Sequence, residues 1–145
     1  MLELAIINGP NLNLLGKREP EVYGHASFEE FLEQLKKDFP TVHFTYFQSN
    51  IEGEIVEAIQ SNGFNKAGII LNPAAYTHTS IAIGDAVAAI QTPVIEVHIS
   101  NVHAREDFRK ISHVSAKSVG SIVGLGLKGY ALATEWFLAK AGAIQ

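Results

Sequence analysis

Five short apolar runs alternate along the chain with segments of helical periodicity, and this alternation constrains the fold more than any other feature. The runs are rich in β-branched residues and cover Leu2–Asn8, Val42–Gln48, Ala67–Asn72, Val94–Ile99 and Val119–Gly124. Strands that alternate with helices pair in parallel through right-handed crossovers, and runs this apolar predict strands buried on both faces. The expected fold is a single α/β domain over residues 1–145, a three-layer, doubly wound, flavodoxin-like sandwich around a five-stranded parallel sheet.

Four helices are expected around these runs. Ser27 has the features of an N-cap because Glu30 follows at capping-box spacing, and Pro40 ends the helix that begins there. The other helices are expected over Ile51–Ser61, Thr79–Gln91 and Gly129–Ala141. The third helix is apolar on nearly every side, which predicts that its outer face forms a subunit interface. The alternative is a helix of small alanines that is harmlessly exposed.

Composition and charge exclude several classes of protein. The net charge is −4 and no basic run exists, which argues against a nucleic-acid partner. The chain has no cysteine, so it forms no disulfide and no thiolate metal site, which suits the cytosol. No signal-peptide pattern opens the chain, and no apolar run approaches the ~20 residues of a membrane helix. We expect a cytoplasmic protein without a membrane partner.

The loops after the first, third and fourth runs hold most of the unusual residues. Ligand sites of doubly wound sheets form at the carboxyl ends of such neighbouring strands. The first loop is about 18 residues long, against about two to six in most such units. It carries Arg18 and Tyr23 and is typical of an active-site lid, with a plain surface loop as the alternative. The third run leads through residues 72–80 to a helix start, where backbone N–H groups can meet an anion.

After the fourth run, Glu96 and His98 are two residues apart on a strand and therefore share a face. A carboxylate beside a histidine orients the ring and raises its basicity, although a structural pair in the core is the alternative. The chain has only three arginines, Arg18, Arg105 and Arg109, and all lie in or just after these loops. Their joint placement predicts a site for an anion, since arginine suits planar carboxylates.

These residues are sufficient for acid–base chemistry. A free phenol has a pKa of about 10, and a guanidinium at about 4 Å contributes roughly 4 kcal/mol at an effective dielectric of about 20. That contribution equals about three pKa units. Tyr23 beside Arg18, with Arg105 as a second cation, is thus an adequate base. His98, oriented by Glu96, is a fitting acid, and an acid and a base held apart suit elimination next to a carbonyl.

Three other interpretations remain open. Residues 124–129 match the dinucleotide pattern G-x-G-x-x-G, but too few residues follow for the rest of that motif. A tight turn is expected there, with a nucleotide- or flavin-binding module as the alternative. His98 and His103 could suggest a metal, but no third ligand stands at standard spacing, so no metal is expected. A non-catalytic assembly protein would explain the apolar helix but not the convergence of arginines, tyrosine and the Glu–His pair.

Three blocks of the sequence resemble the type II dehydroquinase family. Residues 9–13 and 16–24, which read GPNLN and GKREPEVYG, resemble its N-terminal signature. The second block is residues 72–80 with Asp85, and the third is Glu96–Asn101 with Arg105–Arg109. The resemblance spans essentially the whole chain. It implies a hydro-lyase of the shikimate pathway, which serves aromatic amino-acid biosynthesis, that needs no cofactor and forms a homododecamer built of trimers.

The resemblance also implies a mechanism. Tyr23 would take a proton from C2 of 3-dehydroquinate to give an enolate, and His98 would protonate the departing C1 hydroxyl. This is an anti elimination of water that gives 3-dehydroshikimate. Arg18, helped by Arg105, would lower the pKa of the tyrosine, while Glu96 would support His98. The water bridging to the enolate oxygen would be held by Asn11. The expected substrate-binding residues are Asn72, His78, Ile99, Ser100 and Arg109, with Asp85 reaching in from a neighbouring subunit.

Two segments depart from the family pattern. Residues 115–118, which read SAKS, stand where the family often has SPVA, and residues 110–113 read KISH in place of a histidine-rich stretch. Neither segment is expected to touch a catalytic position.

Overall fold

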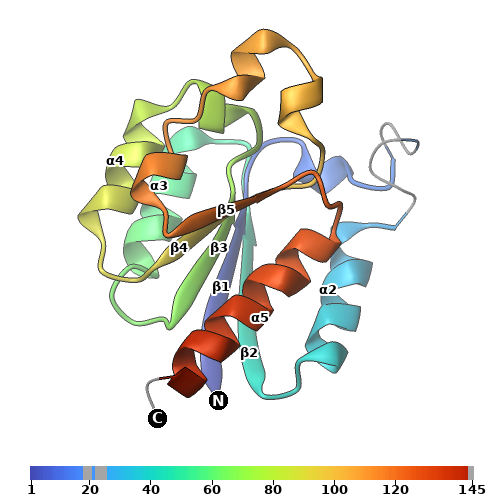
Figure 1. The fold of residues 1–145 in the computed structure, drawn as a ribbon, viewed down its shortest axis with the longest axis vertical. Coiled ribbons are helices and arrows are strands. Elements are labelled where there is room, and N and C mark those ends of the chain that lie inside the picture. Colours follow the sequence, from blue (N-terminus) through green and yellow to red (C-terminus); the bar gives the residue numbers. More distant parts are fainter. Residues whose placement is uncertain (18–20, 22–25, 144–145) are drawn as a thin grey trace.

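The parallel sheet predicted from the apolar runs is present. The computed structural model describes residues 1–17, 21 and 26–143 of the chain. Within these residues, five parallel strands form one sheet in the order β2-β1-β3-β4-β5 (Figure 1). The strands are β1 (Leu2–Asn8), β2 (Val42–Gln48), β3 (Gly68–Asn72), β4 (Val94–His98) and β5 (Gly120–Val123). This order confirms the flavodoxin-like fold and places the carboxyl ends of β1, β3 and β4 side by side.

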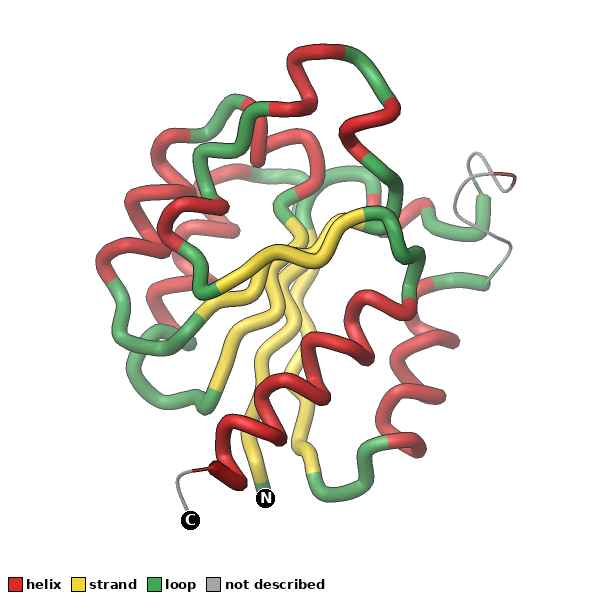
Figure 2. The backbone as a smooth tube through the Cα atoms, viewed as in Figure 1, coloured by secondary structure: helices red, strands yellow, loops and turns green. Residues whose placement is uncertain are grey.

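Helices cover both faces of the sheet, which gives the three expected layers (Figure 2). The described residues form α2 (Phe28–Asp38), α3 (Glu52–Ser61), α4 (Ile81–Ala89) and α5 (Lys128–Ala143). On β1, Leu4 and Ile6 pack with α2 and α5, whereas Ala5 and Ile7 pack with α3 and α4. The two core layers therefore follow from the two-residue alternation of a strand buried on both faces.

Short 3-10 helices occupy the loops at the carboxyl edge of the sheet. They are η1 (Leu12–Leu14), η2 (Ala74–His78), η3 (Val102–Ala104), η4 (Asp107–Lys110) and η5 (Ser115–Lys117). Because these segments follow β1, β3 and β4 or lead into β5, they surround the edge where the site was expected. None of the helices in the described part of the chain is long and apolar enough to span a membrane.

The predicted N-cap at Ser27 is confirmed, whereas the predicted burial of the two edge strands is wrong. The Ser27 hydroxyl accepts a hydrogen bond from the Glu30 backbone N–H at 3.1 Å, which confirms the predicted N-cap. Burial on both faces was wrong for β2 and β5, which lie at the edges of the sheet. Gly120 and Ser121 of β5 are exposed, because a single strand neighbour and one covering helix leave an edge strand open.

Helix α4 begins after the predicted Thr79 because Ser80 caps it, accepting from the Ile83 backbone N–H at 3.0 Å, and it ends at Ala89, before the predicted Gln91. Its inner face is buried, while its outer face is apolar around one acidic residue. The exposed residues are Ile81, Ala82, Asp85, Ala88 and Ala89. The subunit interface expected on this face stays a prediction.

Candidate active site

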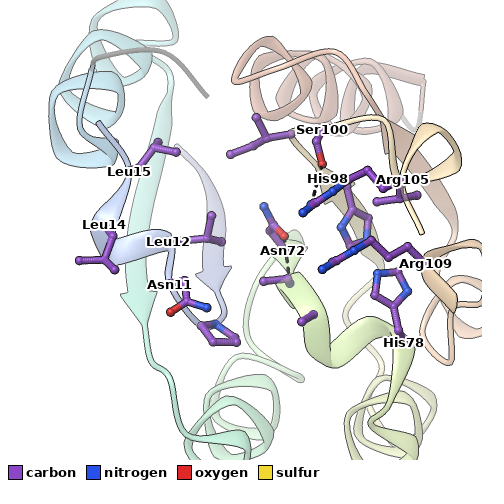
Figure 3. Close-up of a pocket in the computed structure, with 15 residues that line it drawn as sticks. Asn11, Leu12, Leu14, Leu15, Asn72, His78, His98, Ser100, Arg105 and Arg109 are labelled. Carbon is purple, nitrogen blue, oxygen red and sulfur yellow. Dashed lines mark hydrogen bonds between the residues drawn. The ribbon is translucent and has the colours of Figure 1, made fainter. Parts of the chain in front are cut away.

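A pocket opens at the carboxyl ends of β1, β3 and β4 (Figure 3). It encloses about 740 Å³, including open solvent at its mouth. One wall is the loop after β1, the opposite wall is formed by η2, η3 and η4, and the end of β4 forms the floor. The lining residues are Pro10, Asn11, Leu12, Leu14, Leu15, Asn72, Ala74, Ala75, His78, His98, Ile99, Ser100, Val102, Arg105 and Arg109.

Asn11 begins the wall that follows β1, in a left-handed conformation with φ of 70°. Its backbone N–H donates to Asn50 Oδ1 at 3.0 Å, and Gln48 Nε2 donates to the same oxygen at 3.2 Å. Gln48 also donates to the carbonyl of Gly9 at 3.1 Å. Two side chains near the end of β2 thus anchor the start of this loop, which leaves the Asn11 side chain at the pocket wall.

Asn72, at the end of β3, is held by a buried hydrogen-bond chain. Its Oδ1 accepts from the Ala74 N–H at 3.1 Å, and its Nδ2 donates to the Tyr130 hydroxyl at 2.9 Å. That hydroxyl donates in turn to Asn8 Oδ1 at 2.8 Å. Burial raises the pKa of Tyr130 well above its ordinary value, so the phenol stays neutral. Because an amide nitrogen has two hydrogens, Asn72 keeps one donor for a ligand.

Glu96 and His98, on one face of β4, form a buried pair. His98 Nε2 lies 2.5 Å from Glu96 Oε2, and the Glu96 side chain is only 1% exposed. A carboxylate only accepts, so Nε2 carries the hydrogen and Nδ1 is the nitrogen left for the pocket. Burial would raise the pKa of Glu96, but the hydrogen bond and charge of His98 and the hydroxyls of Ser115 and Thr77 lower it to about 2. Glu96 is therefore an anion across the neutral pH range.

This carboxylate makes the stability of the fold depend on pH. Because the folded pKa of Glu96, about 2, lies below its ordinary value of 4.5, its contribution is present above pH 4.5 and is lost as pH falls through about 2. We expect protonation of this group to lower the free energy of unfolding by about 2 kcal/mol between about pH 5 and pH 3. Urea unfolding of the parent protein and of Glu96→Gln across this range measures the difference in slope. Parallel slopes would contradict the prediction.

His78, in η2, presents a neutral ring to the pocket. Its Nδ1 lies 2.7 Å from the Ile111 carbonyl, which only accepts, so Nδ1 carries the hydrogen. Desolvation lowers the pKa of His78, helped by the charges of His98 and Arg109, although the Ile111 hydrogen bond opposes the shift. The ring stacks on that of His98 with centroids 6.2 Å apart. Its Nε2 is consequently a hydrogen-bond acceptor suited to a hydroxyl group.

Two arginines give the pocket a positive wall on the same side as the histidines (Figure 3). Arg105 Nη1 donates to the Ser100 hydroxyl at 3.4 Å, which ties η3 to the end of β4. Arg109 pairs with Glu106 through Nε and stacks over the ring of Phe108 at 5.1 Å. Two guanidinium groups at one wall attract an anionic ligand, because the planar guanidinium fork matches the geometry of a carboxylate.

The fold brings together most of the residues that the sequence singled out. Lining the pocket are Asn11, Asn72, His78, His98, Ile99, Ser100, Arg105 and Arg109. Glu96 lies directly behind His98. Tyr23, the expected base, and its partner Arg18 lie outside the described residues. Asp85 lies on the outer face of α4, where its carboxylate is 3.9 Å from Lys117 Nζ, and it does not line the pocket of its own chain.

Sequence reasoning missed three hydroxyl residues around Glu96, namely Thr77, Ser112 and Ser115. Two of them fall in the segments that depart from the family pattern. The expectation that those segments touch no position assigned to catalysis was therefore wrong, since both serines contact Glu96. A lone serine carries little sequence signal. The only indication of them is that a buried carboxylate needs hydrogen-bond donors.

The sequence also suggested two alternative sites, a nucleotide site at residues 124–129 and a metal site at the histidines. Gly124 and Gly126 have φ of +87° and +64°, a conformation that favours glycine, and their N–H groups donate to the carbonyls of His98 and Ile99. A Cβ on Gly129 would lie 3.2 Å from Val97, so this glycine allows close packing of α5 on the sheet. The described residues contain no group of three or more His, Asp or Glu side chains arranged around a metal ion.

Comparisons with known proteins agree with this geometry. The sequence model of the dehydroquinase class II family matches residues 2–138. A 3-dehydroquinate dehydratase of Halothermothrix orenii is 51% identical over 137 residues, which cover 93% of each chain. The crystal structure of a type II dehydroquinase from Butyrivibrio crossotus superposes with a TM-score of 0.89 at 44% identity, covering 94% of this chain and 97% of the other. That of Propionibacterium acnes gives 0.87 at 39% identity, with 94% and 95% covered. The chain belongs to the class II dehydroquinase family and is an enzyme of the hydro-lyase class.

Proposed function

We propose that this chain dehydrates 3-dehydroquinate to 3-dehydroshikimate by anti elimination through an enolate. The names of its relatives support the substrate, and the Glu96–His98 pair facing a pocket with two arginines supports the chemistry. The setting we propose is the shikimate pathway in the cytoplasm, where the product serves aromatic amino-acid synthesis. The reaction as proposed needs no metal and no organic cofactor.

His98 is the proposed general acid. With Nε2 bound to Glu96, protonated His98 carries a second hydrogen on Nδ1, directed to the pocket. That proton goes to the C1 hydroxyl as the C1–O bond breaks, and the electrons of the enolate form the C1–C2 double bond. The Glu96 anion stabilises the imidazolium that this step requires.

Tyr23 is the proposed base, which removes the C2 proton of the substrate. It lies outside the described residues, so its role rests on the resemblance and on the electrostatic argument for a phenol beside Arg18. Arg105 lines the pocket and is the second cation available to stabilise a phenolate and the enolate. We assign the bridging water at the enolate oxygen to Asn11, whose side chain stands at the wall opposite His98.

The remaining polar groups are proposed to hold the substrate. Arg109 suits the carboxylate of the substrate, because a guanidinium and a carboxylate form two parallel hydrogen bonds. His78 Nε2 accepts from a ring hydroxyl, and the spare amide hydrogen of Asn72 donates to another. The backbone at Ile99 and Ser100 completes this side of the site.

The proposed assembly is a homododecamer of trimers, in which Asp85 of one chain reaches the pocket of its neighbour. The apolar outer face of α4 supports this assignment. We expect Ala88→Glu, which places a charge in that face, to yield a smaller species in analytical ultracentrifugation and to raise KM. Ala139→Glu makes the same change on the exposed side of α5 and should keep the parent size. An unchanged mass for Ala88→Glu would remove α4 from the interface.

The proposed reaction is tested by following the ultraviolet absorbance of the conjugated product after 3-dehydroquinate is added to metal-stripped protein. We expect a steady rise that is insensitive to chelator and to borohydride, which would trap the Schiff base of a type I mechanism. Folded protein that gives no rise would overturn the proposed function. Inactivation by borohydride in the presence of substrate would overturn the enolate mechanism, although the dehydratase reaction would still be assigned to this protein.

A further inference from the structure

The carboxylate of Glu96 is enclosed by three hydroxyl groups in addition to His98. Thr77 Oγ1 lies 2.5 Å from Oε2, and Ser115 Oγ lies 2.5 Å from Oε1. Ser112 Oγ lies 3.1 Å from Oε1 and 3.2 Å from Oε2. A carboxylate offers about four acceptor positions, so these contacts and His98 together saturate it. We call these three residues, Thr77, Ser112 and Ser115, the hydroxyl cage.

The direction of these hydrogen bonds is determined by the other partners of the hydroxyls. Ser112 Oγ accepts from the backbone N–H groups of Val114 at 3.1 Å and Ser115 at 2.9 Å, which occupies both of its lone pairs. Its single hydrogen must therefore point to Glu96. Ser115 Oγ accepts from Ser121 at 3.3 Å and donates to Oε1. The cage fits an anion, because a protonated carboxyl group would have no acceptor at Ser112.

We propose that Thr77, Ser112 and Ser115 are positioning residues that hold Glu96 as an oriented anion and so control how tightly it binds the His98 imidazolium. Hydroxyl donors share the charge of the carboxylate, and a buried carboxylate without them would be desolvated and free to rotate. The kinetic part of this inference rests on the proposed function, whereas the electrostatic part does not.

None of the cage residues lines the pocket, so their effect on the reaction must pass through Glu96 and His98. They come from two separate segments, η2 and the stretch that leads into η5. Glu96 thus connects both segments to His98, the proposed general acid. Loss of a cage hydroxyl should therefore lower kcat and leave KM nearly unchanged.

The test requires that the other titratable groups near Glu96 are the same in the variants and in the parent protein. His98 lies on its own strand, and His78 of η2 stacks on His98 and feels the charge of Glu96. Arg109 of η4 acts on His78. From the stretch that leads into η5, the hydroxyls of Ser112 and Ser115 contact the carboxylate. Changing a cage hydroxyl alters none of these charged groups.

Thr77 offers a matched pair of variants, because valine keeps its shape without the hydroxyl and serine keeps the hydroxyl. The carboxyl group of Glu96 is followed by carbon NMR in glutamate-labelled protein as pH is lowered. We expect Thr77→Val to raise the pKa of Glu96 by about one unit, since one charge-assisted hydrogen bond is lost. Thr77→Ser should restore the parent titration. Ser118→Ala, whose hydroxyl donates to the Val114 carbonyl, should leave it unchanged.

Kinetics supply the second readout. We expect kcat of Thr77→Val to fall about tenfold at neutral pH with KM unchanged, and its ratio to the parent kcat to fall further as pH is lowered. Ser115→Ala, at a partly exposed position, tests the same point if Thr77→Val does not fold.

The outcomes separate the two proposals. An unmoved Glu96 titration in folded Thr77→Val and Ser115→Ala would overturn the cage, and so would a raised KM at unchanged kcat. If the parent protein does not turn over 3-dehydroquinate, the proposed function fails while the titration still decides the cage.

Discussion

Replacement of His98 by alanine is expected to lower kcat by about a thousandfold, with the fold retained. Among the described residues, this side chain is the one imidazole that contacts a buried carboxylate and also lines the pocket. Without it, the C1 hydroxyl must leave without its assigned proton donor. The measurement is steady-state kinetics with 3-dehydroquinate, combined with circular dichroism to verify folding. KM should change little, because the groups proposed to hold the substrate, Asn72, His78 and Arg109, are unchanged.

His103→Ala is the matched control, since this histidine is exposed in η3 and does not line the pocket. It should retain parent kcat. A His98→Ala variant with more than about a tenth of parent kcat would assign the acid to another group. His78, the other imidazole among the described residues that line the pocket, would then be the first residue to replace.

Tyr23→Phe is expected to lower kcat by about a thousandfold or more while the protein stays folded and keeps its oligomeric state. The change removes the phenolic oxygen and little else, so a loss of this size would identify that oxygen as the base. Activity is compared with that of Tyr76→Phe, which removes a hydroxyl that donates to the Asn50 carbonyl at 2.8 Å outside the pocket.

The pH profile adds a second criterion for Tyr23. Parent kcat should fall as pH is lowered, because the phenolate takes up a proton. The residual activity of Tyr23→Phe should lack that acid limb. Retained turnover in Tyr23→Phe would remove tyrosine from the mechanism, and an unchanged acid limb in a slow variant would assign the limb to a different group.

The proposed general acid lies on an interior strand of the sheet. Glu96 and His98 lie on β4, between β3 and β5, and the cage hydroxyls fasten two loops to the same carboxylate. A central strand varies little in position, so a proton donor placed there keeps its distance to a bound substrate. The other wall, after β1, is anchored by Gln48, which donates to the Gly9 carbonyl, and by Asn50, which accepts from the Asn11 N–H.

The sequence by itself determined the architecture and the strand face that carries the proposed acid. Alternation of apolar runs with helical periods requires parallel strands with crossovers, and this is a local signal of the chain. The capping box at Ser27 and the two-residue spacing of Glu96 and His98 are equally local, so both were correctly placed in space. Clustering of the arginines after strand ends indicated an anion site, because parallel strands end at one edge of the sheet.

Only the tertiary structure decided which groups donate hydrogen bonds to the Glu96 carboxylate and which strands are exposed at the edges of the sheet. Thr77 and Ser112 lie 19 and 16 residues from Glu96 in the chain, and Tyr130 lies 58 residues from Asn72. No helical or strand period relates positions so far apart, because the paths of the intervening loops determine whether they meet. The exposure of Gly120 and Ser121 in β5 likewise depends on the place of this strand at the sheet edge, which strand composition does not encode.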